Sequence, residues 1–424
     1  MACKAALELW NDLPADLAES IARCLPCPFD RFCMSRVCST WRRGVRHLQK
    51  QPIPPPTPLP WFLLPYRRVC DHPRRGTRYG RFFCVLCNRI HRVRVPLNTG
   101  GARFFGAYQG GWIFIAYGQN RRHVLIYLPV LHTQGRPGNR LPDVVSWNGN
   151  PERRMFILAA TLSAPPVPSK NCVAAAIIMT IPVEFPKLIT IWRMGSLRPT
   201  FCRTTPMDVE DVIYHNDAFY FINRDLNLLE CKPNFQEEAP LEQLEVRTKE
   251  LRFLPMMIIG DGADVRARYL VESRGELLMV VRLSLDQKET SSFSVFRIMR
   301  PHPAHADYCW DELPELGGRM IFVEHGCSIS YEVADFHGSQ EGVYFHDECF
   351  YDDEVRMIYD NRGRDREYPC SDNGRCSELP DDVQCLYRAF ELTEKRLVFD
   401  GVVHTTFMEG YWKQGKDKEA MDNY

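Results

Sequence analysis

The sequence predicts an α+β multidomain chain, in which a small three-helix module precedes a large, mainly β domain. Apolar residues recur at helical spacing over the first fifty residues, and a proline run follows them. Short apolar runs separated by turn residues then fill most of the remaining chain. We therefore expect a helical domain over residues 1–50, a linker over 51–60, a β domain over 61–410 and a flexible tail over 411–424.

Composition and charge narrow the classes of protein to consider. Hydrophobic residues make up 45% of the chain and charged residues 25%, which is ordinary for a protein with a buried core. Lys+Arg and Asp+Glu both number 53, so the basic excess of a nucleic-acid binder is missing. The longest apolar stretch, Val173 to Ile181, is about half of a membrane span. We expect neither a nucleic-acid partner nor a membrane segment.

The chain begins without the charged start and long apolar run of a secretory signal. This predicts a protein of the cytoplasm, the nucleus or both. In those compartments the 17 cysteines should stay reduced, mostly as small buried apolar residues.

Helical spacing is clear in the first domain. Asp12 is a suitable cap in front of Pro14, and Leu17, Ile21 and Leu25 then recur every four residues. These positions predict a helix from about Pro14 to Leu25. Two further helices are predicted, one that starts near Phe29 and carries Val37, and one through Trp41, Val45 and Leu48.

Six prolines follow between Pro52 and Pro60 and exclude a helix interior or a central strand there. A stiff polyproline-type spacer is the natural interpretation. Pro55 and Pro58 also form a P-x-x-P pattern of the kind bound by aromatic-grooved domains, and this alternative stays open.

From Trp61 onward, β-prone runs alternate with turn signals such as Asn216-Asp217 and Arg274-Gly275. About 300 residues of this pattern exceed one sandwich and suit a β-propeller of four-stranded blades. A plan of strand, polar turn and second strand recurs at intervals of about sixty residues, too irregularly to fix the number of blades. It is seen in segments 211–232, 267–284 and 329–348.

The first domain resembles the F-box family, in the segment WNDLPADLAESIARCLPCPFDRFCMSRVCSTWRRGVRHL. The matching features are a Leu-Pro pair, a helical apolar stripe, a Val-Cys pair and a Trp-Arg pair. Three short helices cannot bury all of their apolar side chains among themselves, which predicts an exposed patch for a partner. The matching residues are Leu13, Pro14, Leu17, Ile21, Leu25, Val37, Cys38, Trp41 and Arg42.

The F-box resemblance implies that this module binds a Skp-type adaptor and, through it, a cullin. Val37 and Trp41 are expected to pack inside the module. The residues expected to contact the adaptor are Leu13, Pro14, Leu17, Ile21 and Leu25.

The remaining chain resembles the KIB-type domain of plant F-box proteins, which is similar to a kelch-like propeller. The resemblance covers about residues 59–350, and the sequence departs from the family pattern after Asp352. Its motifs are LPWFLLP, GAYQGGWIFIAY, FSVFRI and WDELPELGGRMIFVEHGCSISYEVADF followed by GVYFHDE.

The two resemblances together imply the substrate-recognition subunit of a Skp–cullin–F-box ubiquitin ligase, in which the propeller captures a target protein. Such a subunit is not an enzyme and needs no cofactor. Motifs for nucleotide binding, serine hydrolysis and zinc-peptidase chemistry are missing from the sequence, in agreement with this expectation. Two alternatives stay open: an interaction module that occludes or inhibits a client without its degradation, and a zinc-binding protein.

The zinc alternative depends on Cys84-x-x-Cys87 followed by His91, a spacing that fits a metal site. A strand predicted there would send Cys84 and Cys87 to opposite faces unless a turn intervenes. Cys24 and Cys27 fall at the end of a predicted helix with no evident partner. The expectation is therefore that the protein holds no metal.

Overall fold

The computed structural model describes a helical part, a β-rich part and short pieces beyond them. The proline-rich segment 51–60 and the tail 411–424 lie outside the described residues, and so does the P-x-x-P pattern. The described residues are 13–25, 27–50, 61–64, 79–86, 89–94, 103–109, 111–117, 122–127, 139–147, 149, 151–166, 172–181, 187–204, 208–234, 244–255, 264–285, 290, 292–299, 307–336, 340–346, 356–357, 366–367 and 387–390.

Three helices form the N-terminal module, as the sequence predicts. They are α2 (Ala15–Cys24), α3 (Pro28–Ser35) and α4 (Ser39–Lys50). Pro28 occupies the first turn of α3, where a missing backbone N–H leaves no hydrogen bond unmade. No described helix has the length and apolar character needed to cross a membrane.

Helices α2 and α4 approach each other closely because small residues line their contact. Ala18 and Ala22 of α2 are fully buried. A Cβ atom added to Gly44 of α4 would lie 2.8 Å from the backbone nitrogen of Glu19 and 2.9 Å from the backbone oxygen of Ala15. Glycine at position 44 therefore sets how near the two helix axes can come.

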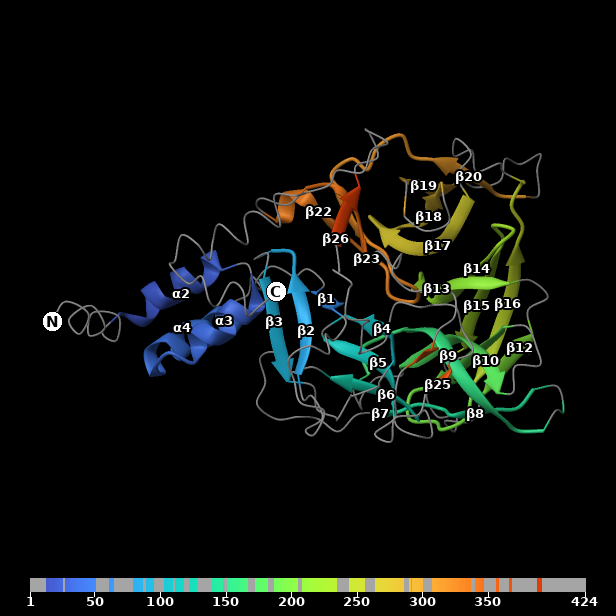
Figure 1. The fold of residues 1–424 in the computed structure, drawn as a ribbon, viewed down its shortest axis with the longest axis horizontal. Coiled ribbons are helices and arrows are strands. Elements are labelled where there is room, and N and C mark those ends of the chain that lie inside the picture. Colours follow the sequence, from blue (N-terminus) through green and yellow to red (C-terminus); the bar gives the residue numbers. More distant parts are fainter. Residues whose placement is uncertain are drawn as a thin grey trace.

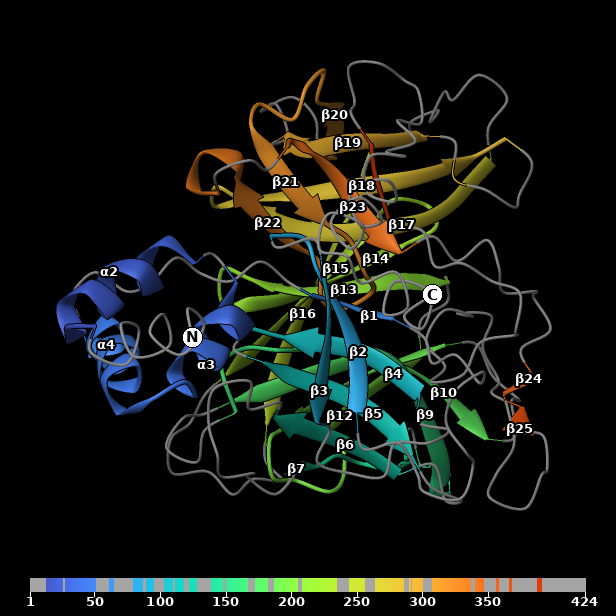
Figure 2. The same cartoon turned by 60° about the vertical axis from the view of Figure 1, so that its left-hand side comes forward.

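The β-rich part is a five-bladed propeller, built from five antiparallel or mixed sheets (Figures 1 and 2). The first blade contains β4 (Arg103–Tyr108), β5 (Trp112–Tyr117), β6 (Arg122–Tyr127) and β7 (Asn139–Arg140). The second contains β8 (Val144–Val145), β9 (Arg153–Leu162), β10 (Val173–Ile181), β11 (Leu188–Arg193) and β12 (Phe201–Thr204).

The other three blades follow in chain order. The third contains β13 (Val209–His215), β14 (Ala218–Asn223), β15 (Leu228–Asn234) and β16 (Glu245–Leu251). The fourth contains β17 (Asp264–Ser273), β18 (Glu276–Ser284), β19 (Ser292–Met299) and β20 (Cys309–Glu312). The fifth contains β21 (Arg319–Phe322), β22 (Ile329–Glu332), β23 (Gly342–His346) and β26 (Tyr387–Phe390), with a 3₁₀ turn at Val333–Asp335.

Separate apolar clusters join consecutive blades. Strand β10 illustrates the arrangement, because its side chains alternate between two faces. Ala174 and Ala176 face the first blade, whereas Val173, Ala175 and Ile177 face the third. A strand buried on both faces needs apolar residues at consecutive positions, which explains the long apolar run at 173–181.

Tight turns join the first two strands of the third and fourth blades, at the predicted turn signals. Asn216 and Asp217 have φ angles of 45° and 61°, and Arg274 and Gly275 have φ angles of 55° and 76°. Consecutive left-handed residues are typical of the hairpin turn that matches the twist of antiparallel strands. The first two repeats, 211–232 and 267–284, are therefore confirmed as hairpin units.

The third predicted repeat, 329–348, is not a hairpin. Strand β21 lies between β22 and β23, antiparallel to the first and parallel to the second. The 3₁₀ turn at Val333–Asp335 follows β22, and the chain passes to the far side of β21 before β23 begins. All three repeats have the same local pattern of two apolar runs and a polar turn. Only the strand with which each run pairs distinguishes the third repeat from the two hairpins.

A three-stranded sheet, β1 (Trp61–Leu64), β2 (Tyr79–Cys84) and β3 (Arg89–Arg94), lies between the helices and the propeller (Figures 1 and 2). Val85 and Leu86, just after β2, pack against an apolar cluster of the fifth blade. Strands β24 (Arg356–Met357) and β25 (Arg366–Glu367) form a separate two-stranded sheet.

Candidate functional site

The helical module has an exposed surface with apolar side chains that a partner could contact. Leu17 on α2 is 49% exposed, and Pro14 in front of this helix is also exposed. Leu13, Ile21 and Leu25, which were expected to contact an adaptor as well, are partly buried and pack against the internal cluster of the module. The surface available to a partner is therefore smaller than the stripe predicted from the sequence.

The exposure of Val37 differs from a second prediction. Its side chain is 56% exposed in the bend between α3 and α4, so it does not pack inside the module as expected. Trp41 does pack against the internal cluster of Ala18, Ala22, Met34 and Val45. Val37 instead adds an apolar side chain to the surface.

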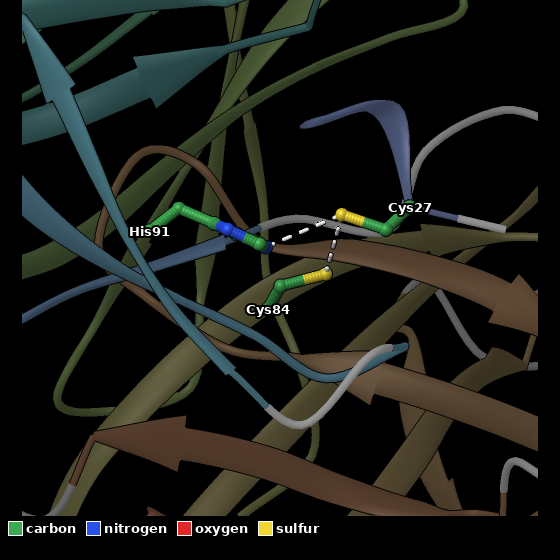
Figure 3. Close-up of side chains that lie close together, drawn as sticks. All are labelled: Cys27, Cys84 and His91. Carbon is green, nitrogen blue, oxygen red and sulfur yellow. Dashed lines mark hydrogen bonds between the residues drawn. The ribbon is translucent and has the colours of Figure 1, made fainter. Parts of the chain in front are cut away.

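A second site lies where the helices meet β2 and β3 (Figure 3). Sγ of Cys27 lies 3.2 Å from Nε2 of His91 and 3.8 Å from Sγ of Cys84. The three ligand atoms all lie within 4.8 Å of one another. Cys27 and Cys84 are fully buried, and His91 is 5% exposed.

The register of the sheet explains why Cys84 and His91 come together. Phe82 pairs with His91, and Cys84 pairs with Arg89 and with Trp61. Directly paired residues point to the same face of a sheet, as do residues two apart on one strand. Trp61, Phe82, Cys84 and His91 therefore share one face, and the start of α3 brings Cys27 to it.

Aromatic rings surround the imidazole of this site. The ring centroids of Phe29 and Trp61 lie 4.5 Å and 5.1 Å from that of His91. The indole N–H of Trp61 is buried without an acceptor among the described residues. Rings on these sides keep water away and lower the local dielectric constant.

Charged groups of α3 lie close by. Burial and then the nearness of Cys27 raise the pKa of Asp30, while His91 and Arg89 act in the opposite direction. Burial also lowers the pKa of Arg31, whose Nε donates a 2.9 Å hydrogen bond to the backbone oxygen of Leu25. The cluster of Cys27, Cys84 and His91 is thus enclosed by a mixed apolar and ionic rim.

Sequence reasoning identified Cys84 and His91 as metal candidates but set Cys27 aside, because it found no partner for the pair of Cys24 and Cys27. Cys87, the other predicted ligand, lies outside the described residues. Strand β2 ends at Cys84 and a turn follows at Val85 and Leu86, so Cys84 stands at a strand end. Cys27 is 57 residues away in the chain, and no spacing rule joins positions in two different domains.

A third cluster closes the centre of the propeller. The turn after β21 carries Gly326, whose backbone N–H donates to Oδ1 of Asp211 at 2.6 Å. Oδ2 of Asp211 accepts a 2.7 Å hydrogen bond from the backbone N–H of Leu270. The ring of His325 in the same turn lies 4.7 Å from that of Tyr269. One carboxylate therefore ties together the third, fourth and fifth blades.

The described cysteines are thiols that form no disulfide. Burial raises the pKa of the Cys172, Cys202, Cys231 and Cys327 thiols to about 12. Such thiols stay protonated at neutral pH and behave as small apolar groups, as predicted, whereas Cys24 and Cys33 are exposed, against the prediction.

Comparisons with solved structures return remote similarities. Hsv2 of Kluyvelomyces marxianus is 9% identical with a TM-score of 0.25, and the match covers 56% of this chain and 81% of that one. Hsv2 of Kluyveromyces lactis is 8% identical with a TM-score of 0.25, over 56% and 82% of the two chains. BBS1N in complex with ARL6DN is 10% identical with a TM-score of 0.22, over 56% and 85%.

No curated protein matches the chain. The family model of the KIB1-4 beta-propeller matches residues 82–365. The matched segment begins in β2 and spans all the blades as far as β23. Because this match covers well over half of the 424 residues, the chain belongs to the KIB1-4 beta-propeller family.

Proposed function

We propose that this protein is the substrate-recognition subunit of a Skp–cullin–F-box ubiquitin ligase. In this role the N-terminal helices are an F-box that binds a Skp-type adaptor, and the propeller captures a target protein. The observation that carries the proposal is a three-helix module with exposed apolar side chains attached to a propeller, the fold of an interaction domain.

The distribution of exposed apolar side chains supports the adaptor-binding role. Six large apolar side chains are exposed among the described residues, and Leu17 and Val37 of the small helical module are two of them. Figure 1 places α2 and α4 at the end of the molecule away from the blades. A partner can reach this end without contact with the propeller, and exposed apolar groups are what such a partner would cover.

The receptor role requires no active site on this chain. Ubiquitin is transferred from a partner enzyme, and the receptor raises the local concentration of a target lysine beside that enzyme. Propeller blades present connecting loops at their two ends, and loops held by a rigid scaffold are common binding surfaces. The chain would act in the cytoplasm, the nucleus or both.

The test is binding of the full-length protein to a purified Skp-type adaptor. The double variant Leu17→Glu with Val37→Glu should weaken binding at least tenfold, because two carboxylates would be buried in an apolar interface. Leu197→Glu is the matched control, since Leu197 is 50% exposed on the propeller. The double variant Leu13→Ala with Pro14→Ala is a second test. Because Leu13 also packs inside the module, circular dichroism must show that the helices of this variant persist.

Full-strength binding by the Leu17→Glu, Val37→Glu variant, with the module still folded, would refute the adaptor role. An interaction module that occludes its client is the remaining alternative, and the same propeller would serve it. Client abundance separates the two roles. Inactivation of the cullin should raise the abundance of a degradative client and leave that of an occluded client unchanged.

A further inference from the structure

The cluster of Cys27, Cys84 and His91 joins two parts of the protein that the proposed function treats separately. Cys27 is the residue that precedes helix α3, Cys84 ends β2 and His91 belongs to β3 (Figure 3). The side chains converge from 57 and 64 residues apart in the chain. Their convergence therefore depends on how the helical module sits against the sheet.

The two distances from Sγ of Cys27, to Sγ of Cys84 and to Nε2 of His91, are close to those around one tetrahedral metal ion. With Zn–S bonds of ~2.3 Å and Zn–N bonds of ~2.0 Å, tetrahedral angles place two sulfurs ~3.8 Å apart and a sulfur and a nitrogen ~3.5 Å apart. The observed Sγ–Sγ distance is 3.8 Å and the observed Sγ–Nε2 distance is 3.2 Å. A disulfide would require ~2.05 Å between the sulfurs, so the pair is not positioned as a covalent bridge.

The donor chemistry selects a soft divalent ion. Two thiolates and one imidazole favour zinc over magnesium or calcium, which prefer oxygen ligands. Two thiolates also neutralise the double positive charge, so the complete centre can be buried without a large desolvation penalty. Burial of all three side chains and the nearby rings of Phe29 and Trp61 fit such a neutral centre.

We propose that Cys27, Cys84 and His91 bind a zinc ion that clamps the helical module to the three-stranded sheet. On binding, each of the two thiols releases one proton to solvent, and each sulfur and Nε2 of His91 donates an electron pair to Zn²⁺. Among the described residues no fourth Cys, His, Asp or Glu places a ligand atom within the same cluster, so the fourth position is left to water or to a ligand from elsewhere.

The clamp would fix the orientation of the helices relative to the blades. A metal ion bound by ligands from two domains opposes their relative movement, because such movement would pull ligands away from the ion. Without the ion this restraint is lost. A fixed orientation matters for any protein whose two ends bind different partners. The zinc site does not depend on the adaptor role and would be present even if the helices bind nothing.

Zinc content of the purified full-length protein is the primary measurement. The unmodified chain should carry about one zinc per molecule. Cys27→Ser, Cys84→Ser and His91→Gln should each lower that content at least tenfold. Cys33→Ser is the matched control and should leave the zinc content unchanged, because Cys33 is an exposed thiol on α3, the helix that Cys27 precedes.

A rescue variant separates lost ligation from failed folding. His91→Cys supplies a thiolate, which also ligates zinc, and should retain the ion where His91→Gln does not. Cobalt added to the zinc-free protein should give thiolate-to-metal charge-transfer absorption in the unmodified chain and in Cys33→Ser, but not in Cys27→Ser. Removal of zinc with a chelator should lower the thermal midpoint of the unmodified chain and leave that of Cys27→Ser unchanged.

Three results would overturn the proposal. The unmodified protein could contain no zinc and take up none. Zinc could persist in Cys27→Ser while Cys84→Ser loses it, which would show a site within the sheet and no clamp. Equal zinc in all variants would show an adventitious ion only. Adaptor binding is measured separately, so its loss with zinc content intact would count against the proposed function and not against this site.

Discussion

The backbone N–H of Gly326 donates a 2.6 Å hydrogen bond to Oδ1 of Asp211, although the two residues are 115 positions apart. Asp211 is fully buried, and its second oxygen accepts from Leu270. Gly326 has a φ of +74°, and a Cβ atom there would lie 2.7 Å from the backbone oxygen of Ala160. Strand β9 of the second blade, which contains Ala160, thus also touches this central turn.

Gly326→Ala should destabilise the propeller by about 1–3 kcal/mol, because the methyl group collides with the backbone and the left-handed φ is strained. Gly275→Ala is a control with a φ of +76° and no atom within 4 Å of the added Cβ. Urea unfolding of the two variants separates packing from strain. Equal losses would show that backbone strain alone accounts for the effect at Gly326.

Asp211→Asn should lower the free energy of unfolding by about 2–4 kcal/mol. An amide keeps one acceptor oxygen but turns an NH₂ group toward a backbone N–H, so one of the two central hydrogen bonds is lost. Asp225→Asn in an exposed turn serves as the control and should change stability by less than about 0.5 kcal/mol. If Asp211→Asn were as mild as this control, the carboxylate would not be what holds the centre together.

Acid should weaken the junction between the first and second blades through Asp143. Burial opposes its ionisation, but hydrogen bonds from His123 and Arg140 lower the pKa of Asp143 to about 2. A carboxyl group whose folded pKa lies below its unfolded value of about 4 stabilises the fold above that value and stops doing so as pH falls through the folded pKa.

The difference in unfolding free energy between the unmodified protein and Asp143→Asn should therefore shrink by about 1 kcal/mol from pH 5 to pH 3. Urea titrations at several pH values measure this difference directly. Two parallel stability curves over this range would show that Asp143 makes no net contribution through its charge.

Gly44→Ala should destabilise the helical module, although alanine normally stabilises a helix interior over glycine by about 1 kcal/mol. The reversal follows from the Cβ atom, which would lie 2.8 Å from the backbone of Glu19. Amide hydrogen exchange of α2 and α4 should accelerate about tenfold for each 1.4 kcal/mol lost. Arg43→Ala, at an exposed neighbouring position, should leave exchange unchanged, and slower exchange in Gly44→Ala would contradict the close approach of the helices.

Local patterns predicted the helices and many of the strands. Helical spacing placed α2 and α3, with Pro14 near the start of α2, because helix geometry depends on neighbours a few residues apart. The turns at Asn216-Asp217 and Arg274-Gly275 were likewise readable, since left-handed φ angles favour a few residue types. Segment 329–348 has the same local signal as the two hairpins, but its two strands both pair with β21 and not with each other. The prediction that it repeats the hairpin plan was therefore wrong.

Side-chain roles within the helical module were harder to predict. Ile21 was expected to contact the adaptor and Val37 to pack inside the module, but Ile21 packs inward and Val37 is exposed. The difference arises because Ile21 lies on α2, against the other helices, while Val37 lies in the bend before α4. The spacing of apolar residues predicts which side chains share one face of a single helix. It does not predict how the bend after that helix orients the next helix.

By itself, the sequence determined a three-helix module followed by a β-propeller, since both depend on patterns repeated along short stretches of chain. Only the tertiary structure decided that four of the five blades meet at Asp211 and Gly326, and that Cys27 meets Cys84 and His91. These contacts join residues 57 to 115 positions apart. Their geometry follows from how whole blades and helices pack, which no local pattern encodes.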